Sequence, residues 1–515
     1  MRSSCRFVAL PVCFLLLLAL ACNFPFARPG SNGPLTGEQL RQTLGAPLAT
    51  GTSEVAQTAG ATPPQTALPT PEVTQQATQP PPEGFYAYQT RSGDTLQGLA
   101  GRFGVSAEQI SLLTGEPQAG LLQPGQNVSI PNVLDEVTPE GALLPDSEMV
   151  YSPSSADFDL AAFVQGAGGY LSTYNEAVDG EELSGAAIIQ RVADELSVNP
   201  RLILALLEFR SHGVYGQPMD PQGFDHPIGF YVPGRSGLYQ ETMIAATQLN
   251  VAYYGWRQGT FTEIKFRGKT TTRRLNPTLN AGSVAVQHLL AMLYDEGDWH
   301  EAVYGEEGFA ALYQRMFGDA WARAANVEPL FPADLTQPTL ELPFLPGERW
   351  GFTAGPHPSW NAGTPRGALD FSPVTGEAVC AVSRAWVTAS APGVVVRSRD
   401  NLVALDLDGD GHEQTGWVVV YYHLAEKDLV PAGRRVALDE PLGHPSCEGG
   451  RATGKHVHIA RKYNGEWLAA DGPLPFILSG WVAQAETRNY YGNLVKGDQI
   501  VSSNPSGTRT SIIIR

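Results

Sequence analysis

Two histidines near the C-terminus, His456 and His458, are separated by a valine and followed by an isoleucine. These β-branched neighbours indicate a strand, in which alternate side chains share a face, so the two rings should lie about 7 Å apart on one side. Two imidazoles on one face can serve a metal ion, or a metal ion and its bound water. A surface strand with two solvated histidines is the simpler alternative for this motif alone.

Three further residues in the same part of the chain have suitable chemistry. His357 lies in a Gly-Pro-His motif, Asp370 follows it by thirteen residues, and His423 follows two tyrosines at the end of a predicted strand. A catalytic zinc site needs two or three imidazole or carboxylate ligands and an open position for water. The C-terminal third therefore contains the residue types of a hydrolytic zinc site.

The spacing of these motifs resembles that of the lysostaphin-type zinc metallopeptidases, most closely the β-lytic and staphylolysin branch. That branch has a histidine thirteen residues before the aspartate, a Tyr-Tyr-His motif, and Cys-Glu-Gly-Gly-x-x-Thr-Gly-x-His-x-His, which here begins at Cys447. A Tyr-Asn-Gly turn follows at 463–465. Lys455 departs from the pattern, because the family usually has proline there.

By position, the resemblance implies that His357, Asp370 and His458 bind Zn²⁺. It also implies that His423 and His456 flank the metal-bound water and the scissile carbonyl. Zinc lowers the pKa of bound water to about 7 and polarises a carbonyl group. One histidine could then accept the water proton and the other could stabilise the oxyanion. The sequence leaves open which does which.

The N-terminus has the plan of an export signal. Arg2 and Arg6 precede an apolar run at 8–21, which is too short to span a membrane. It resembles a bacterial lipoprotein signal, which implies that Cys22 carries a lipid and anchors the chain to the membrane. Ala19 stands where that pattern prefers leucine, and a plain secretory signal is the alternative. Both alternatives predict an extracytoplasmic protein.

An oxidising compartment permits disulfides between the remaining cysteines. Only Cys380 and Cys447 lie beyond the N-terminal segment. We predict that they pair. In the related branch the cysteine before Glu-Gly-Gly is also bridged, but its partner lies elsewhere in the chain, so the resemblance does not fix this pairing.

Residues 22–84 are rich in Pro, Thr and Gln and are predicted to form a disordered linker. Residues 86–131 follow with Asp94 as a predicted helix N-cap and a short strand at 126–130. This unit resembles a LysM module, which implies binding to the N-acetylglucosamine of peptidoglycan or chitin. A unit of the same fold that has lost sugar binding is the alternative.

Apolar residues recur at helical spacing in four segments, 183–196, 200–211, 239–254 and 279–296. Residues 198–211 resemble the start of a lysozyme-like transglycosylase domain. In that family a catalytic glutamate directly precedes the serine, but here Arg210 precedes Ser211, and arginine cannot act as a general acid. Glu208 is displaced by two positions. We therefore expect a non-catalytic domain that is structural or binds glycan.

The C-terminal region is predicted to be β-rich, with strands at 394–398, 402–407 and 417–422. The segment 406–411 opens like a calcium loop. Trp417 replaces the acidic residue expected at its twelfth position, which favours a polar turn.

The chain has 515 residues and a formal net charge of −18, so we expect several domains and no nucleic-acid partner. The predicted fold is multidomain: a small βααβ LysM unit, an all-α lysozyme-like middle domain and an all-β antiparallel metallopeptidase domain. The predicted segments are the signal 1–21, linker 22–84, LysM module 85–132, linker 133–154, helical domain 155–335 and metallopeptidase domain 341–515.

Together these patterns predict a monomeric, extracytoplasmic zinc endopeptidase that cuts peptide cross-links of peptidoglycan. The LysM module would hold it on glycan, and the lipid on Cys22 would hold it at the membrane. The alternative is a wall-binding scaffold or activator of another hydrolase that does no chemistry itself.

Overall fold

The computed structural model describes residues 84–112, 120–218, 221–507 and 509–515. They all belong to one compact unit, residues 34–515. The predicted signal, Cys22 and the predicted linker up to residue 83 lie outside the described residues. Among the helices that are described, none is long and apolar enough to cross a membrane.

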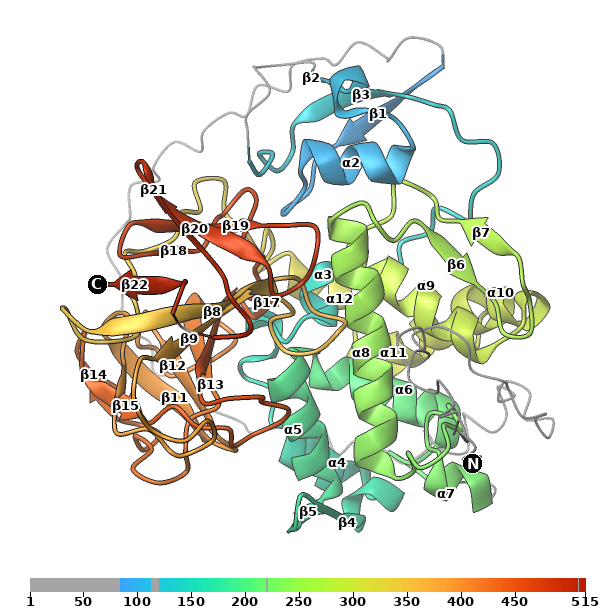
Figure 1. The fold of residues 1–515 in the computed structure, drawn as a ribbon. Coiled ribbons are helices and arrows are strands. Elements are labelled where there is room, and N and C mark those ends of the chain that lie inside the picture. The colour runs from blue at the N-terminus through green and yellow to red at the C-terminus, as the bar shows by residue number, and fades with distance from the viewer. Residues whose placement is uncertain (1–83, 113–119, 219–220, 508) are drawn as a thin grey trace, which may run out of the picture. The chain divides into compact units, whose positions relative to one another are not determined.

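The LysM region forms a three-stranded antiparallel sheet with a helix beside it (Figure 1). The central strand β3 contributes Val128 and Ile130 to the core, and the helix contributes Leu99 and Phe103, all fully buried. The elements are β1 (Phe85–Gln89), α2 (Leu96–Phe103), the 3₁₀ turn η1 (Ala107–Gln109), β2 (Ser111–Leu112) and β3 (Asn127–Pro131).

The predicted cap of α2 is wrong by one residue. Thr95 is the N-cap, and its hydroxyl accepts a hydrogen bond from the Gly98 N–H. The Asp94 carboxylate is buried instead, where it pairs with Arg102 and accepts a hydrogen bond from the Tyr88 hydroxyl at 2.9 Å. Because a buried charge must be paired, the Asp94 carboxylate bonds Arg102 and Tyr88 within the core, and Thr95 caps the helix instead.

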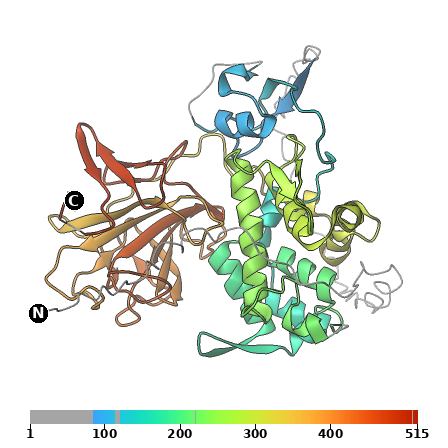
Figure 2. The same ribbon diagram turned by 45° about the vertical axis from the view of Figure 1, so that its right-hand side comes forward.

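The helical region contains the four predicted helices, but residues 183–184 end a strand instead of starting a helix, and the last segment is divided. They are α5 (Gly185–Leu196), α6 (Pro200–Ser211), α8 (Leu238–Arg257) and α9 (Ala281–Leu293). The predicted segment 279–296 breaks after Leu293 because the Asp295 carboxylate accepts hydrogen bonds from two backbone N–H groups and starts a new helix, α10 (Glu296–Tyr304). Helix α8 packs against both α5 and α9 (Figures 1 and 2).

Two hairpins and several short helices complete this region, so it is not purely helical. They are α3 (Asp146–Met149), the 3₁₀ turns η2 (Pro153–Ser155) and η3 (Tyr170–Ser172), α4 (Leu160–Ala167), β4 (Asn175–Val178), β5 (Glu181–Ser184), α7 (Pro221–Asp225), β6 (Glu263–Lys265), β7 (Thr272–Arg274), α11 (Phe309–Phe317) and α12 (Ala320–Ala324).

The predicted linker at 133–154 is partly wrong, because its second half belongs to the helical fold. Met149 and Glu148 are fully buried in α3. The Glu148 carboxylate pairs with the Arg323 guanidinium at 2.9 Å and accepts a hydrogen bond from the Tyr313 hydroxyl. This short polar stretch has no hydrophobic period, so its burial depends on partners far along the chain.

The C-terminal region is built on a nine-stranded antiparallel sheet in the order β14-β11-β12-β13-β16-β9-β8-β22, with β17 paired to β16. The strands are β8 (Arg349–His357), β9 (Ala368–Pro373), β11 (Gly393–Arg399), β12 (Leu402–Asp406), β13 (Trp417–Tyr422), β14 (Arg435–Val436), β16 (Val457–Tyr463), β17 (Glu466–Trp467) and β22 (Ile512–Ile514).

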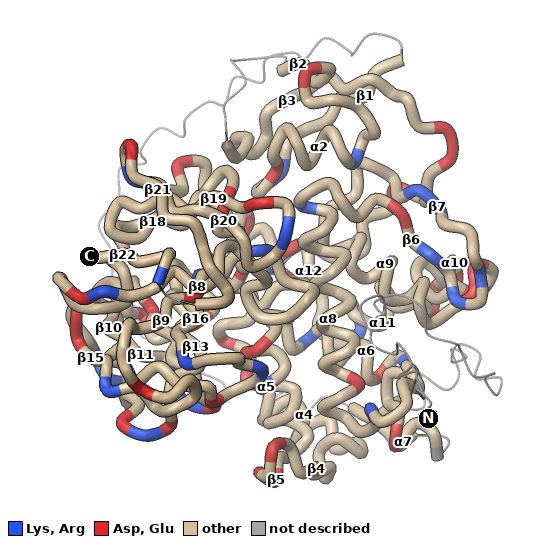
Figure 3. Tube along the Cα trace, viewed as in Figure 1, with Lys and Arg blue, Asp and Glu red and all other residues tan. Residues whose placement is uncertain are grey.

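Two smaller sheets flank it: a pair of β10 (Val387–Thr388) with β15 (Pro441–Gly443), and a four-stranded sheet of β18 (Ile477–Leu478), β19 (Trp481–Ala485), β20 (Gly492–Lys496) and β21 (Gln499–Ser502). Figure 3 shows lysine and arginine positions interspersed with aspartate and glutamate positions in this region.

The two faces of the large sheet differ in what they bury. One face places Leu369, Phe371 and Ile459 in a core formed within the C-terminal region. The opposite face places Ala368 and Ala460 in a buried cluster that also contains residues of the helical region. Because side chains alternate along a strand, Asp370 and His458 lie on this second face.

Candidate metal centre

Three neighbouring strands bring the predicted ligands together. Strand β9 lies between β8 and β16 in the sheet. His458 is directly opposite Asp370 in the β16–β9 register, and His357, at the end of β8, is opposite Ala368 on β9. Antiparallel pairing therefore places at one point on the sheet three residues that are far apart in sequence.

The ligand atoms of this cluster converge closely. The His357 Nε2 atom lies 3.0 Å from His458 Nδ1 and 3.2 Å from Asp370 Oδ1, and His458 Nδ1 lies 3.3 Å from the same oxygen. All three side chains are buried. This is the size of gap that one small cation fills with three ligands.

In His357 and His458, the ring nitrogen that faces away from the cluster determines the tautomer. His357 Nδ1 lies 2.9 Å from the Gly355 carbonyl oxygen, and His458 Nε2 lies 2.9 Å from the Ser359 carbonyl oxygen. A carbonyl only accepts, so these nitrogens donate, and each ring in its neutral form directs its lone pair toward Asp370.

Three acceptors then face one another, and the buried Asp370 Oδ1 has no hydrogen-bond partner. A divalent cation would satisfy all three, so the residues present fit zinc.

The charges in the cluster favour the metal-binding protonation state at two of the three ligands. Burial alone would lower the pKa of His357, but the Asp370 carboxylate outweighs burial and raises it, so a metal ion would have to displace a proton there. Burial, with a smaller contribution from His357, lowers the pKa of His458 and so keeps its ring neutral. Burial alone would raise the pKa of Asp370, but the neighbouring His357 and His456 outweigh it and hold that pKa well below its usual range. An ionised carboxylate and a neutral imidazole are the forms that bind zinc.

Two more histidines lie beside this cluster. The His423 and His456 rings are 4.5 Å apart between centroids, and His456 Nε2 lies 3.6 Å from Asp370 Oδ2. Each ring uses Nδ1 on a backbone carbonyl, that of Glu448 at 2.9 Å and that of Gly454 at 2.7 Å respectively. Both therefore keep Nε2 for other partners. Burial first, and then the neighbouring histidines, lower the pKa of His423 to about 4.

Backbone and aromatic groups complete the surroundings, and of these only Tyr422 belongs to a motif that the sequence singled out. Tyr490 stacks on the His357 ring at 4.7 Å between centroids and is 48% exposed. It has a left-handed backbone, with φ of 73°. Trp360 packs on Tyr422 at 4.8 Å. The Ser359 carbonyl, which orients His458, is a backbone group that any residue type could supply.

Glu208 and the acidic segment 406–411 both form hydrogen bonds within their own parts of the fold. The buried Glu208 carboxylate accepts hydrogen bonds from the Val214 and Tyr215 N–H groups at 3.0 Å. Arg210 donates to the Ile228 carbonyl and to the Tyr294 hydroxyl.

In the 406–411 segment, the Asp406 carboxylate accepts three backbone N–H groups and closes a tight turn, as predicted. The carboxylates of Asp406, Asp408 and Asp410 come close enough to hold a cation, but exposed acidic groups are common without one.

Comparison with known proteins agrees with this geometry. The family described as the LasA N-terminal domain matches residues 142–331, and the LysM domain matches residues 88–131. Protease LasA of Pseudomonas aeruginosa is 28% identical over 351 residues, which cover 64% of this chain and 75% of that protein. The β-lytic metalloendopeptidase of Lysobacter enzymogenes is 28% identical over 162 residues, 30% of this chain and 84% of that protein.

Among solved structures, the M23 metalloprotease pseudoalterin from the deep sea aligns with 36% of this chain and 100% of its own, at 22% identity and a TM-score of 0.29.

The converging ligand atoms agree with the chain's similarity to a protease and a metalloendopeptidase. A LysM domain and a LasA-like N-terminal domain precede the region that holds these ligand atoms. None of the matches tests the predicted resemblance of the helical region to lysozyme-like domains, which stays a prediction.

Proposed function

We propose that this protein is an extracytoplasmic zinc endopeptidase that hydrolyses peptide cross-links of bacterial peptidoglycan. The observation that carries the proposal is the buried Asp370 Oδ1, which has no hydrogen-bond partner and faces one ring nitrogen each of His357 and His458. The names of the relatives, a protease and a metalloendopeptidase, support the reaction class. The LysM match supports glycan as the attachment site.

In the proposed mechanism His357, Asp370 and His458 hold the metal. Bound zinc supplies a Lewis acid and an activated water. The Nε2 atoms of His423 and His456 are free to accept the proton of the attacking water and to donate to the developing oxyanion. The backbone carbonyls at Glu448 and Gly454 fix both rings through their Nδ1 atoms, so the chain holds these groups in place before the substrate arrives.

The proposal predicts about one zinc per chain, as expected for a single three-ligand site. Elemental analysis of the purified protein measures it, and a chelator should remove zinc and peptide hydrolysis in parallel. A non-catalytic scaffold is the competing proposal. A folded, zinc-loaded protein that cleaves no cross-linked peptide would favour it. We also propose that the mature chain is monomeric and lipidated at Cys22.

Deleting the LysM module, residues 86–131, should lower hydrolysis of intact walls but not of a short soluble peptide. The module raises the local substrate concentration without contacting the reacting groups. Rates on both substrates, measured side by side with the full chain, test this. Equal losses on both would show that the deletion disturbs the peptidase domain instead.

Replacing Glu208 with glutamine should leave wall hydrolysis within about twofold of wild type, as expected for a group that takes no part in acid–base chemistry. The glutamine oxygen can still accept from the backbone at Val214 and Tyr215, so the fold should persist. Chromatography of the wall products gives the readout. Wild-type products with new reducing or anhydro-sugar ends that vanish in this variant would mean that the helical domain cleaves glycan.

A further inference from the structure

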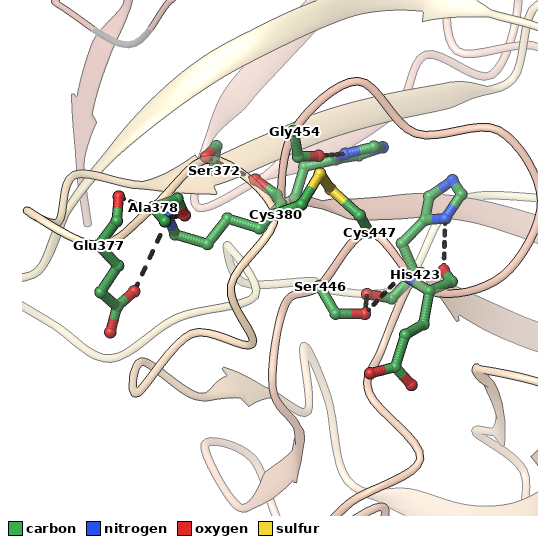
Figure 4. The surroundings of a disulfide bond; sticks show 11 residues. Ser372, Glu377, Ala378, Cys380, His423, Ser446, Cys447 and Gly454 are labelled. Atoms are coloured by element: carbon green, nitrogen blue, oxygen red, sulfur yellow. Dashed lines mark hydrogen bonds and ion pairs between the residues drawn. A yellow bond between two sulfur atoms is a disulfide. The ribbon is translucent and has the colours of Figure 1, made fainter.

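A short segment, Ser446–Glu448, forms hydrogen bonds with both histidines that are not proposed as metal ligands. Figure 4 shows its residues Ser446 and Cys447 near His423. The Ser446 N–H and hydroxyl both donate to the His423 carbonyl, at 2.8 and 3.0 Å, and the Ser446 carbonyl accepts from the His456 N–H at 3.3 Å. The Glu448 carbonyl accepts from the His423 ring at 2.9 Å. The Ser446–Glu448 segment therefore holds the backbone of both histidines and the ring of His423.

The backbone at His423 needs this support. Its φ is 63°, in the left-handed region that residues other than glycine seldom adopt. Such a conformation persists only when its surroundings hold it. The two hydrogen bonds from Ser446 to the His423 carbonyl provide that hold at the strained residue itself.

A disulfide to another loop holds Cys447, the middle residue of the segment. Cys447 is bonded to Cys380, which lies on the surface in the connection between β9 and β10 (Figure 4). We call residues 377–385 the brace loop. Its Ser383 N–H donates to the Pro445 carbonyl at 3.0 Å, so the loop contacts the residue just before the segment as well.

Lys455 attaches the same loop to the chain at His456, which lies just before β16. Its side chain is 7% exposed, and Nζ donates to the Ala378 carbonyl at 2.8 Å. Its backbone N–H donates to the Val379 carbonyl at 2.8 Å. A buried lysine needs such partners, because its charge is costly to remove from water. The brace loop is thus tied to both histidine-bearing segments.

The two histidines proposed as metal ligands are oriented by other groups. His357 and His458 use the carbonyls of Gly355 and Ser359, and neither of these belongs to the brace loop. Loosening the loop should therefore disturb His423 and His456 more than the zinc ligands.

We propose that the Cys380–Cys447 disulfide and Lys455 are positioning elements for His423 and His456, and that opening the disulfide slows peptide hydrolysis without releasing zinc. The inference rests on the proposed peptidase function. The surface position of Cys380 makes the bond reachable by a dithiol. In that step the S–S bond breaks, two protein thiols form, and the dithiol is oxidised to its own cyclic disulfide.

The test uses the full zinc-loaded chain, with dithiothreitol as the reductant. The double variant Cys380→Ala/Cys447→Ala and the single variant Lys455→Met should each lower kcat on a soluble cross-linked peptide by about 10–100-fold, the usual effect of groups that orient reacting side chains. KM and zinc content should stay near wild type. Dithiothreitol should slow the wild type, reoxidation should restore it, and the double variant should not respond.

Two controls separate positioning from general loss of structure. Lys496 also donates from Nζ to a backbone carbonyl, that of Ser479 at 2.8 Å, but on a strand that holds no candidate ligand. Lys496→Met should keep full kcat, and Lys455→Arg should recover part of the rate. The His423 tautomer, read by ¹⁵N NMR, should be Nδ1–H in wild type and mixed in the cysteine variant.

Full kcat in both the cysteine and Lys455→Met variants would overturn the proposal, as would loss of zinc in step with rate. If the cysteine variant fails to fold, Lys455→Met and reduction of the wild type decide. A wild type that holds zinc but has no turnover would contradict the proposed function instead. In that case the tautomer decides the inference, which fails if reduction leaves the tautomer unchanged.

Discussion

Replacing Asp370 with alanine should remove zinc and peptide hydrolysis together. The remaining His357 and His458 form a two-histidine site, which binds zinc weakly, and the water then loses its activation. The lost carboxylate also carries the negative charge that faces both rings at 3.2 and 3.3 Å. We expect hydrolysis at the level of a metal-free blank. Elemental analysis beside turnover on a cross-linked peptide measures both quantities in one preparation.

The acidic turn in the same domain offers a matched control. Asp408 belongs to a second group of carboxylates that could hold a cation, but it is exposed and lies in a turn. Asp408→Ala should keep both zinc and rate. A zinc content that falls in this variant and not in Asp370→Ala would place the metal at the turn and contradict the assignment of the site.

Replacing His456 with alanine should give the opposite pattern, with zinc retained and the rate lost. General acid–base groups contribute about 10²–10⁴-fold, and we expect a loss in that range. The ligand atoms of His357, Asp370 and His458 converge without His456, whose Nε2 lies 3.6 Å from the second oxygen of the carboxylate.

His458→Ala is the companion variant, because His458 lies two residues further along the chain, within β16, and both rings approach the Asp370 carboxylate. It should lose zinc as well as rate. If His456→Ala loses zinc while His458→Ala retains it, the two histidines have exchanged the roles we assign.

The bounds of helices and strands were predictable where a single local feature of the sequence determines them. Helix α6 begins and ends at the predicted residues because Pro200 suits its first position and the Asn199 side chain caps it. Strand β13 also has the predicted bounds, since its run of valines and tyrosines favours a strand. The convergence of His357, Asp370 and His458 was expected from family spacing alone, because sequence does not give the strand order that places β9 between the other two.

The differences from prediction have a common physical cause. Asp94, Glu148 and Asp295 are acidic residues whose roles depend on a distant or neighbouring partner. An aspartate can cap a helix or pair with a buried arginine, and the sequence pattern around it does not decide between them. The sequence could not indicate which backbone carbonyls orient the histidine rings, because every residue has one.

The central claim is that the chain cleaves peptide cross-links, and mass spectrometry of the products released from a purified wall of known structure tests it most directly. We expect products with new amino and carboxyl ends within the cross-link and with intact glycan strands. These products should be absent after chelation and restored by zinc. Sugar fragments with intact cross-links, or no products from folded, zinc-loaded protein, would contradict it.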